Sequence, residues 1–246
     1  MSSQRTRPVM RPCILASSSP RRREILGSVG VPFKVVPAHL DEDGFACQFQ
    51  GTFPDLVEAL AVAKARAVAA TEPTFDGWIL AADTTVILDG EMLGKPLDAE
   101  DAVRLLRRLR GRAHQVATGV ALIDSPGGRV VSGQRCTQVW MRSYSDEEIA
   151  AYVETGDPLD KAGAYAVQHR LFRPVEHVEG CYLTVVGLPL CLVRQLLTLQ
   201  GNEALPTAAS AAKAAGVPDT QKTQPMCIWS PLCVAPLPKG AVSPDL

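Results

Sequence analysis

The stretch ILASSSPRRREIL, Ile14–Leu26, places an apolar run, a serine turn and a proline in direct succession. The apolar residues Cys13–Ala16 predict a short buried strand. Pro20 is suited to the first position of a helix, and Ser19 to the N-cap before it. The stretch therefore predicts a strand that turns directly into a helix.

Three arginines, Arg21, Arg22 and Arg23, occupy the first turn of this predicted helix. A helix N-terminus carries about half a positive charge, so a cation there costs roughly 0.3–1 kcal/mol. A bound anion would remove the conflict, because backbone N–H groups, serine hydroxyls and guanidinium groups all match phosphate oxygens. The stretch indicates a phosphate-binding loop, and a solvated basic turn is the alternative that it leaves open.

Strand-like and helix-like segments alternate along the chain as far as Leu199. The strand-like segments are Phe33–Val36, Trp78–Leu88, Gln115–Ile123, Arg135–Arg142 and Ala164–Gln168. The helix-like segments are Pro54–Ala70, Ala99–Arg110, Asp146–Thr155 and Pro189–Leu199. This alternation predicts an α/β fold.

Composition narrows the class of protein. The chain has 246 residues, 46% hydrophobic and 21% charged, which suffices for a full core in a globular protein. Lys and Arg number 25 against 26 Asp and Glu, so the arginine cluster is local and we expect no nucleic-acid partner. Seven cysteines without a C-x-x-C pair favour the reducing cytoplasm. We expect no membrane span, since no apolar run approaches the roughly 20 residues that one needs.

The chain divides by composition into three parts. Residues 1–11 contain arginines and no acid, and we expect a disordered leader there. The alternating segments fill residues 12–200. Residues 201–246 hold seven of the nineteen prolines and an alanine-rich stretch without a sustained apolar period, which predicts a disordered tail.

Asp83 lies inside the apolar run of WILAADTTVILDG, which ends in the two-residue hairpin signal Asp89-Gly90. A carboxylate in such a run is predicted to be buried or to face a cleft. There it needs a cation, hydrogen bonds or a metal ion, or else its pKa rises into the range of a general base. The alternative is an aspartate that caps a turn with Thr84 and Thr85.

Two lysines are candidates for that cation. Lys64 falls on the same face as the apolar stripe of the predicted helix Pro54–Ala70, and a lysine that points inward needs an anion. Lys95 follows the hairpin in an extended segment that could return towards Asp83. The acidic group around Glu42 either supplies oxygen ligands suited to Mg²⁺ or forms a charged loop.

Seven blocks of the sequence share their order and spacing with one enzyme family. They are LASSSPRRREIL, LDED, LAVAKARA, AADTTVILDGEMLGKP, GRAHQVATGVAL, YVETGDPLDKAGAYAVQ and GCYLTVVGLPL. On these blocks residues 12–200 resemble the Maf-like nucleotide pyrophosphatases, relatives of the inosine triphosphate pyrophosphatase superfamily. The resemblance implies a mixed twisted sheet flanked by helices, with two lobes around a central cleft. It also implies hydrolysis of a nucleoside triphosphate to the monophosphate and pyrophosphate, with a divalent cation such as Mg²⁺ or Mn²⁺.

The resemblance implies a role for each matching residue. Asp83 matches the catalytic acid, the general base for water that attacks the α-phosphorus, and Glu42 matches an acidic position that helps to hold the metal with it. The other matching positions bind substrate: Ser19, Arg21 and Arg22 in the phosphate loop, Lys64 and Lys95 beside the phosphates, and Arg21, Thr84 and Gln168 at the base.

The block DKAGAYAVQ resembles the branch of the family that acts on dTTP and UTP. It departs from the family pattern at Ala166 and His169, where glycines are expected. Two alternatives remain open: a 7-methyl-GTP pyrophosphatase, and a nucleotide-binding regulator of cell division without turnover. The resemblance further suggests a homodimer.

Overall fold

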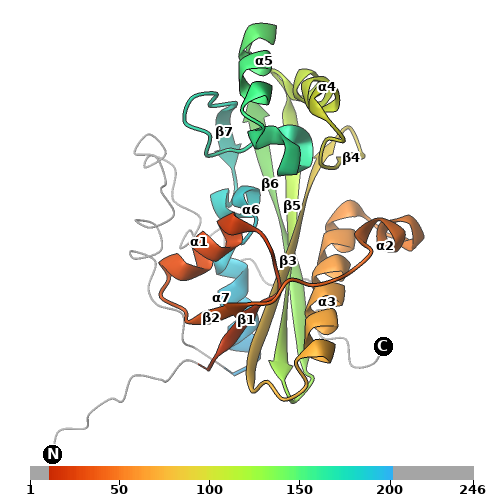
Figure 1. Cartoon of the computed structure of the whole chain (residues 1–246), viewed down its shortest axis with the longest axis vertical. Coiled ribbons are helices and arrows are strands. Elements are labelled where there is room, and N and C mark those ends of the chain that lie inside the picture. Colours follow the sequence, from red (N-terminus) through yellow and green to blue (C-terminus); the bar gives the residue numbers. More distant parts are fainter. Residues whose placement is uncertain (1–10, 202–246) are drawn as a thin grey trace, which may run out of the picture.

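The structure is a computed structural model that describes residues 11–201. Within that range one sheet of seven strands is flanked by helices (Figure 1). The strands are β1 (Cys13–Leu15), β2 (Phe33–Val35), β3 (Gly77–Leu88), β4 (Glu91–Leu93), β5 (Ala113–Ser125), β6 (Val130–Met141) and β7 (Val175–Glu179). The α-helices are α1 (Pro20–Ser28), α2 (Glu42–Gln48), α3 (Phe53–Thr71), α4 (Ala99–Leu109), α5 (Asp146–Glu154), α6 (Tyr182–Val186) and α7 (Leu190–Leu199), and two short 3₁₀ helices are η1 (Asp157–Asp160) and η2 (Ala162–Ala164).

The sheet is mixed, as predicted. β1 pairs in parallel with β2 and with β3, whereas β3, β5, β6 and β7 are antiparallel neighbours. β4 returns antiparallel to β3 through Asp89 and Gly90, whose φ angles of +52° and +76° suit a two-residue hairpin turn. The α/β prediction and the predicted hairpin are confirmed.

One edge of β3 changes its partner part of the way along. β1 pairs with β3 as far as Leu80, and β4 pairs with it from Val86 onward. Between these contacts, no strand of the described chain pairs with residues 81–85 on that edge. The opposite edge pairs with β5 without interruption from Gly77 to Ile87. The gap opens the sheet beside two neighbouring residues, Asp83 and Thr84.

The two faces of the sheet carry different helices. α3 covers one face, and α1, α6 and α7 cover the other, while α4 and α5 lie at one end (Figure 1). Side chains of β3 alternate between these faces, so Ile79 and Ala81 pack with α3 while Leu80 and Ala82 pack with α1 and α7. By the same alternation Asp83 belongs to the α3 face.

Two predicted helices begin where the local signals place them. α1 starts at Pro20 with Ser19 as its N-cap. α3 starts at Phe53, one residue before the predicted Pro54, and Thr52 and Asp55 form a capping box there. The buried face of α3 includes Lys64, which confirms that this lysine points inward.

One predicted strand is wrong. Residues Ala164–Gln168 form the end of η2 and a turn, because Gly163 and Ala164 have φ angles of +68° and +60°, which an extended strand cannot contain. Ala164 is nevertheless buried among the apolar side chains of α4 and α5, so its surroundings resemble those of a strand residue. The strand that pairs with β6 is instead β7, and β6 begins at Val130 rather than at Arg135.

Arg11 fixes the start of the described chain to the sheet. Arg11, the last residue of the predicted leader, donates hydrogen bonds to Asp124 at 2.7 Å and to Asp76 at 2.6 Å, and it lies over the ring of Trp78. The predicted leader up to residue 10 and the predicted tail from residue 202 lie outside the described residues. Within the described range, no helix combines the length and apolar character needed to cross a membrane.

Candidate active site

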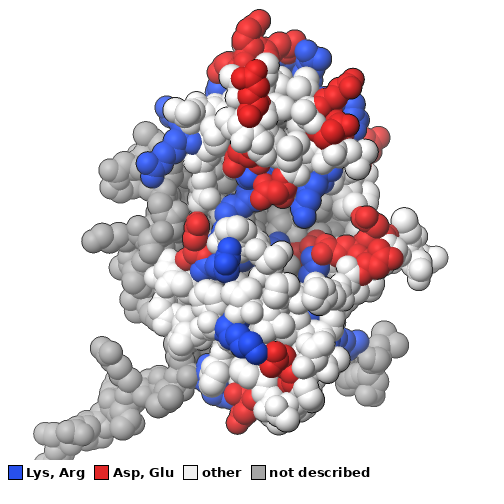
Figure 2. Space-filling view, viewed as in Figure 1, with Lys and Arg blue, Asp and Glu red and all other residues white. Residues whose placement is uncertain are grey.

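A cleft with a volume of about 1010 Å³ lies at the gap in the edge of β3. Its walls come from the β1–α1 loop, α2, α3, the segment after β4 and the turn that follows η1. Figure 2 shows acidic and basic side chains gathered around the middle of this face of the molecule. The structure brings together at this cleft all the residues to which the sequence analysis assigned a function, namely Ser19, Arg21, Arg22, Glu42, Lys64, Asp83, Thr84, Lys95 and Gln168.

The β1–α1 loop is held by the arginine at the start of α1. The Arg22 side chain donates from Nε to the Gly187 carbonyl at 2.8 Å, and from its two terminal nitrogens to Ser17 Oγ at 3.1 Å and Thr84 Oγ1 at 3.0 Å. Its backbone N–H donates to Ser19 Oγ at 3.5 Å. At least three of the five guanidinium donors are therefore bound to the protein, and Arg22 positions the loop.

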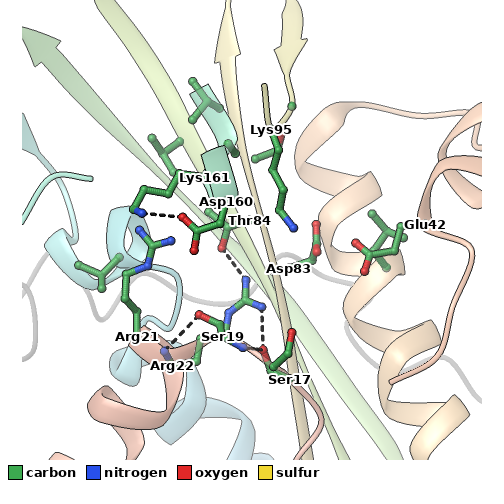
Figure 3. Close-up of a pocket in the computed structure, with 18 of the residues that line it drawn as sticks. Ser17, Ser19, Arg21, Arg22, Glu42, Asp83, Thr84, Lys95, Asp160 and Lys161 are labelled. Carbon is green, nitrogen blue, oxygen red and sulfur yellow. Dashed lines mark hydrogen bonds and ion pairs between the residues drawn. The ribbon is translucent and has the colours of Figure 1, made fainter. Parts of the chain in front are cut away.

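Arg21 and Lys95 differ from Arg22 because they point into the cleft from opposite sides (Figure 3). Arg21 extends towards Asp160 and Lys161, and Lys95 extends towards Asp83 (Figure 3). Among the described residues, neither side chain makes a hydrogen bond or an ion pair. Both cations are consequently available to a ligand with negative charge.

Asp83 is paired with a buried lysine. Lys64 Nζ lies 2.6 Å from Asp83 Oδ1 and 2.8 Å from Glu42 Oε2, so one ammonium group joins two carboxylates. The Lys64 side chain is only 10% exposed, whereas that of Glu42 is 50% exposed. Asp41 caps α2 by accepting from the Gly44 N–H at 2.9 Å, which places Glu42 in the first turn of this helix. Lys64 is therefore a cation partner of Asp83, as the sequence analysis predicted.

Thr84 lies in a network of hydrogen bonds in which Arg22 is the one charged group. Its hydroxyl is 2.9 Å from that of Thr118, which donates to the Thr184 carbonyl at 2.7 Å. The same hydroxyl oxygen accepts from Arg22. This network links β3 to α6 and α1, so it fixes the β1–α1 loop relative to the strand that carries Asp83.

The sequence analysis missed three residues of the cleft lining that hold its wall together, namely Ser17, Asp160 and Lys161. Ser17 binds Arg22, and Lys161 is buried at the cleft wall, where it bonds to Asp157 and Asp160. Asp157 and Lys161 are four residues apart, a spacing typical of an ion pair on one turn of chain. That spacing inside the block GDPLDKAG was the available signal. Ser17 had no comparable signal, because its role depends on the fold of α1.

Two carboxylates of the cleft lining, those of Glu42 and Asp83, could bind a metal ion. The oxygens of Glu42 and Asp83 converge on one ammonium group, so they are placed to share a cation. Within residues 11–201, no group of three or more His, Cys, Asp or Glu side chains is placed to hold a metal ion. Two carboxylates fit Mg²⁺, which binds proteins through one or two carboxylates and completes its shell with substrate phosphates and water.

The fold and the site together define an α/β protein with a cleft at a break in its sheet, whose arginine and lysine side chains suit a phosphorylated ligand. The profile of the family described as Maf-like protein matches residues 12–200, so the chain belongs to this family.

Several relatives in this family carry a specific activity in their names. A dTTP/UTP pyrophosphatase of Dictyoglomus turgidum is 45% identical over 192 residues, which cover 78% of this chain and 97% of the relative. The dTTP/UTP pyrophosphatase of Citrifermentans bemidjiense is 48% identical over 76% of this chain and 95% of its own length. That of Thermomicrobium roseum is 44% identical over 223 residues, 90% of this chain and 94% of the relative.

Proposed function

We propose that this protein is a nucleoside triphosphate pyrophosphatase that hydrolyses dTTP and UTP to the monophosphate and pyrophosphate. The names and the near full-length coverage of the relatives support the reaction and its pyrimidine substrates. The observation that carries the proposal is the position of Asp83. This carboxylate lies at the break in the sheet, bound to Lys64, and faces cations that belong to the phosphate loop and the β4–α4 segment.

Asp83 is proposed to act as the general base. Lys64 binds Oδ1, which leaves Oδ2 to accept a proton from water as the water oxygen attacks the α-phosphorus. The bond from the α-phosphorus to the bridging oxygen then breaks, and its electron pair leaves with pyrophosphate. Arg21 and Lys95 face the cleft without a hydrogen-bond or ion-pair partner among residues 11–201, so they are placed to neutralise the charge that develops on this leaving group.

Glu42 and Asp83 are the residues that would hold a divalent cation together with phosphate oxygens. When bound, such a cation would supply additional neutralisation of phosphate charge. Gln168 lies at the cleft wall next to the phosphate loop. Its amide can both donate to and accept from a pyrimidine edge, which supports the proposed role in base selection.

The cytoplasm is the proposed compartment. All five cysteines of the described residues are free thiols, which supports a reducing environment. The homodimer suggested by the family resemblance stays a prediction, and sedimentation of the full-length chain at micromolar concentration would test it.

A substrate panel tests the proposed reaction. Purified protein is incubated with dTTP, UTP, CTP, GTP and 7-methyl-GTP, with Mg²⁺ or Mn²⁺, while pyrophosphate and orthophosphate are measured separately. We expect pyrophosphate and the monophosphate from dTTP and UTP. Release of orthophosphate, or a preference for 7-methyl-GTP, would contradict the proposal. Binding of UTP without turnover would favour a nucleotide-binding regulator instead.

A further inference from the structure

The hydroxyl group of Tyr152 connects α5 to the turn that carries Gln168. Tyr152 is 2% exposed, and its hydroxyl donates to Asp157 Oδ2 at 2.7 Å. The same oxygen accepts a hydrogen bond from the backbone N–H of Ala166 at 3.1 Å. Burial raises the pKa of Tyr152 well above its ordinary value, so the hydroxyl keeps the proton that it donates. A single oxygen therefore fixes the backbone two residues before Gln168.

Asp157 is in turn held by Lys161. The ammonium group of Lys161 contacts the Asp157 carbonyl, Asp157 Oδ1 at 2.9 Å and Asp160 Oδ1 at 2.5 Å. These three acceptors match the three donors of an ammonium group, so Lys161 is bound to the protein although it lines the cleft. Burial acts against the charge of Asp157, but the hydrogen bonds from Tyr152 and Lys161 lower its pKa overall. Asp157 is thus an ionised acceptor between two donors.

The ring of Tyr152 is also packed against the turn. It stacks on Phe172 with 4.4 Å between ring centroids and contacts the ring of His169 at 4.6 Å. Ala166 and His169, the two residues that replace family glycines in this chain, are thus both in contact with Tyr152. Ring and hydroxyl together hold both ends of the segment that contains Gln168.

We propose that Tyr152 is a positioning residue for base selection, which holds the Ala166–Gln168 turn through the hydrogen-bond chain from Lys161 and Asp157. This inference rests on the proposed function, in which Gln168 recognises the edge of a pyrimidine base. Tyr152 itself does not belong to the cleft lining. It acts on the substrate through the placement of Gln168, and Lys161 acts through Asp157 rather than on phosphate.

The test compares Tyr152→Phe with Tyr144→Phe. Both tyrosines are buried and both rings contact Phe172, but the Tyr144 hydroxyl donates to the Leu106 carbonyl, away from the Gln168 turn. Each variant loses one hydroxyl and keeps its ring. We expect Tyr152→Phe to raise KM for UTP about fivefold to tenfold with kcat nearly unchanged, the loss that one ordinary hydrogen bond produces. The ratio of kcat/KM for UTP over CTP should fall in Tyr152→Phe and hold in Tyr144→Phe.

Two further measurements keep the outcome independent of turnover. Hydrogen exchange of the Ala166 amide should accelerate in Tyr152→Phe and not in Tyr144→Phe, since only the former loses its acceptor. Dissociation constants for UTP and CTP should change as KM does, and Asp157→Asn should shift them in the same direction. If Tyr152→Phe binds UTP and CTP with the same affinities as the wild type does, the inference is overturned. A wild type that binds UTP but releases no pyrophosphate would contradict the proposed function alone, because the affinities would still decide the role of Tyr152.

Discussion

Asp83 and Thr84 are neighbours on β3, yet they meet opposite kinds of environment. On the α3 face, Asp83 is joined through Lys64 to Glu42, so three charged groups converge on one point. On the other face, Thr84 joins Arg22 and Thr118 through hydroxyl hydrogen bonds. The difference separates two tasks. Charges that can exchange a lysine partner for water or a cation suit chemistry, whereas bonds between hydroxyls, carbonyls and one anchored arginine suit positioning.

The largest effect is expected on the charged face, from Asp83→Asn. The amide keeps the size of the side chain but cannot take a proton from water, so kcat should fall at least about a hundredfold. UTP affinity should hold or increase, because one negative charge near the phosphates is removed. Single-turnover hydrolysis and calorimetric binding measure the two quantities.

The matched control for Asp83→Asn is Asp89→Asn, in the turn that directly follows the same strand. Its φ of +52° is one that asparagine adopts readily, so this variant should retain wild-type turnover. A folded Asp83→Asn protein with wild-type kcat would show that Asp83 is not the general base.

Gly119→Ala should disturb the charged face through packing. Gly119 pairs with Asp83 across the sheet, and a Cβ there would lie 2.3 Å from the Val57 carbonyl oxygen on α3. α3, which carries Lys64, would have to move, at a cost of about 1–3 kcal/mol in the free energy of unfolding. Denaturant titration measures this change, and kcat should fall with it.

Gly27→Ala is the control for that packing effect. Its nearest neighbour would be Phe33 at 3.9 Å, an ordinary contact, so the free energy of unfolding should stay level or rise. Equal stability of Gly119→Ala and Gly27→Ala would mean that α3 does not need its close approach to the sheet.

Arg22→Lys tests the positioning face. Lysine keeps the charge, but it lacks the planar guanidinium group that donates to Ser17, Thr84 and Gly187 at once. The β1–α1 loop should therefore become less ordered. We expect KM for UTP to rise about tenfold while kcat changes little. If kcat instead fell as far as in Asp83→Asn, the division of tasks between the two faces would be wrong.

Thr84→Val should have the smallest effect. It removes one of the three hydrogen bonds that the Arg22 guanidinium donates and leaves those to Ser17 Oγ and the Gly187 carbonyl. KM for UTP should rise about twofold to threefold, less than one ordinary hydrogen bond produces, since water in the cleft can replace the hydroxyl. A rise larger than that of Arg22→Lys would make Thr84 a direct contact of the substrate.

Elements with strong local signals were predictable from the sequence. The start of α1 follows from Ser19 and Pro20, and the β3–β4 hairpin follows from Asp89 and Gly90. The inward direction of Lys64 follows from the helical period of α3. In each case the deciding interaction lies within a few residues along the chain, so a short window contains it.

Elements that depend on distant partners were not predictable in this way. The apolar residues of Ala164–Gln168 look like a strand, but the left-handed backbone at Gly163 and Ala164 directs them into the core under α4 and α5. β7 has a weak pattern of its own and exists because β6 offers it an edge. The contact of Glu42 with Lys64 likewise required α2, a helix that the sequence analysis did not predict.

The sequence alone determined which side chains are the candidates for binding phosphate and for accepting a proton. Apart from Glu42, it also determined the local element on which each of those groups lies, because capping, turns and side-chain period act over short distances. Only the tertiary structure decided that β1 and β4 leave a gap beside Asp83, and that a tyrosine on α5 holds the turn of Gln168. Those features are pairings between segments far apart in the chain, and their free energy arises only when the sheet and its helices pack together.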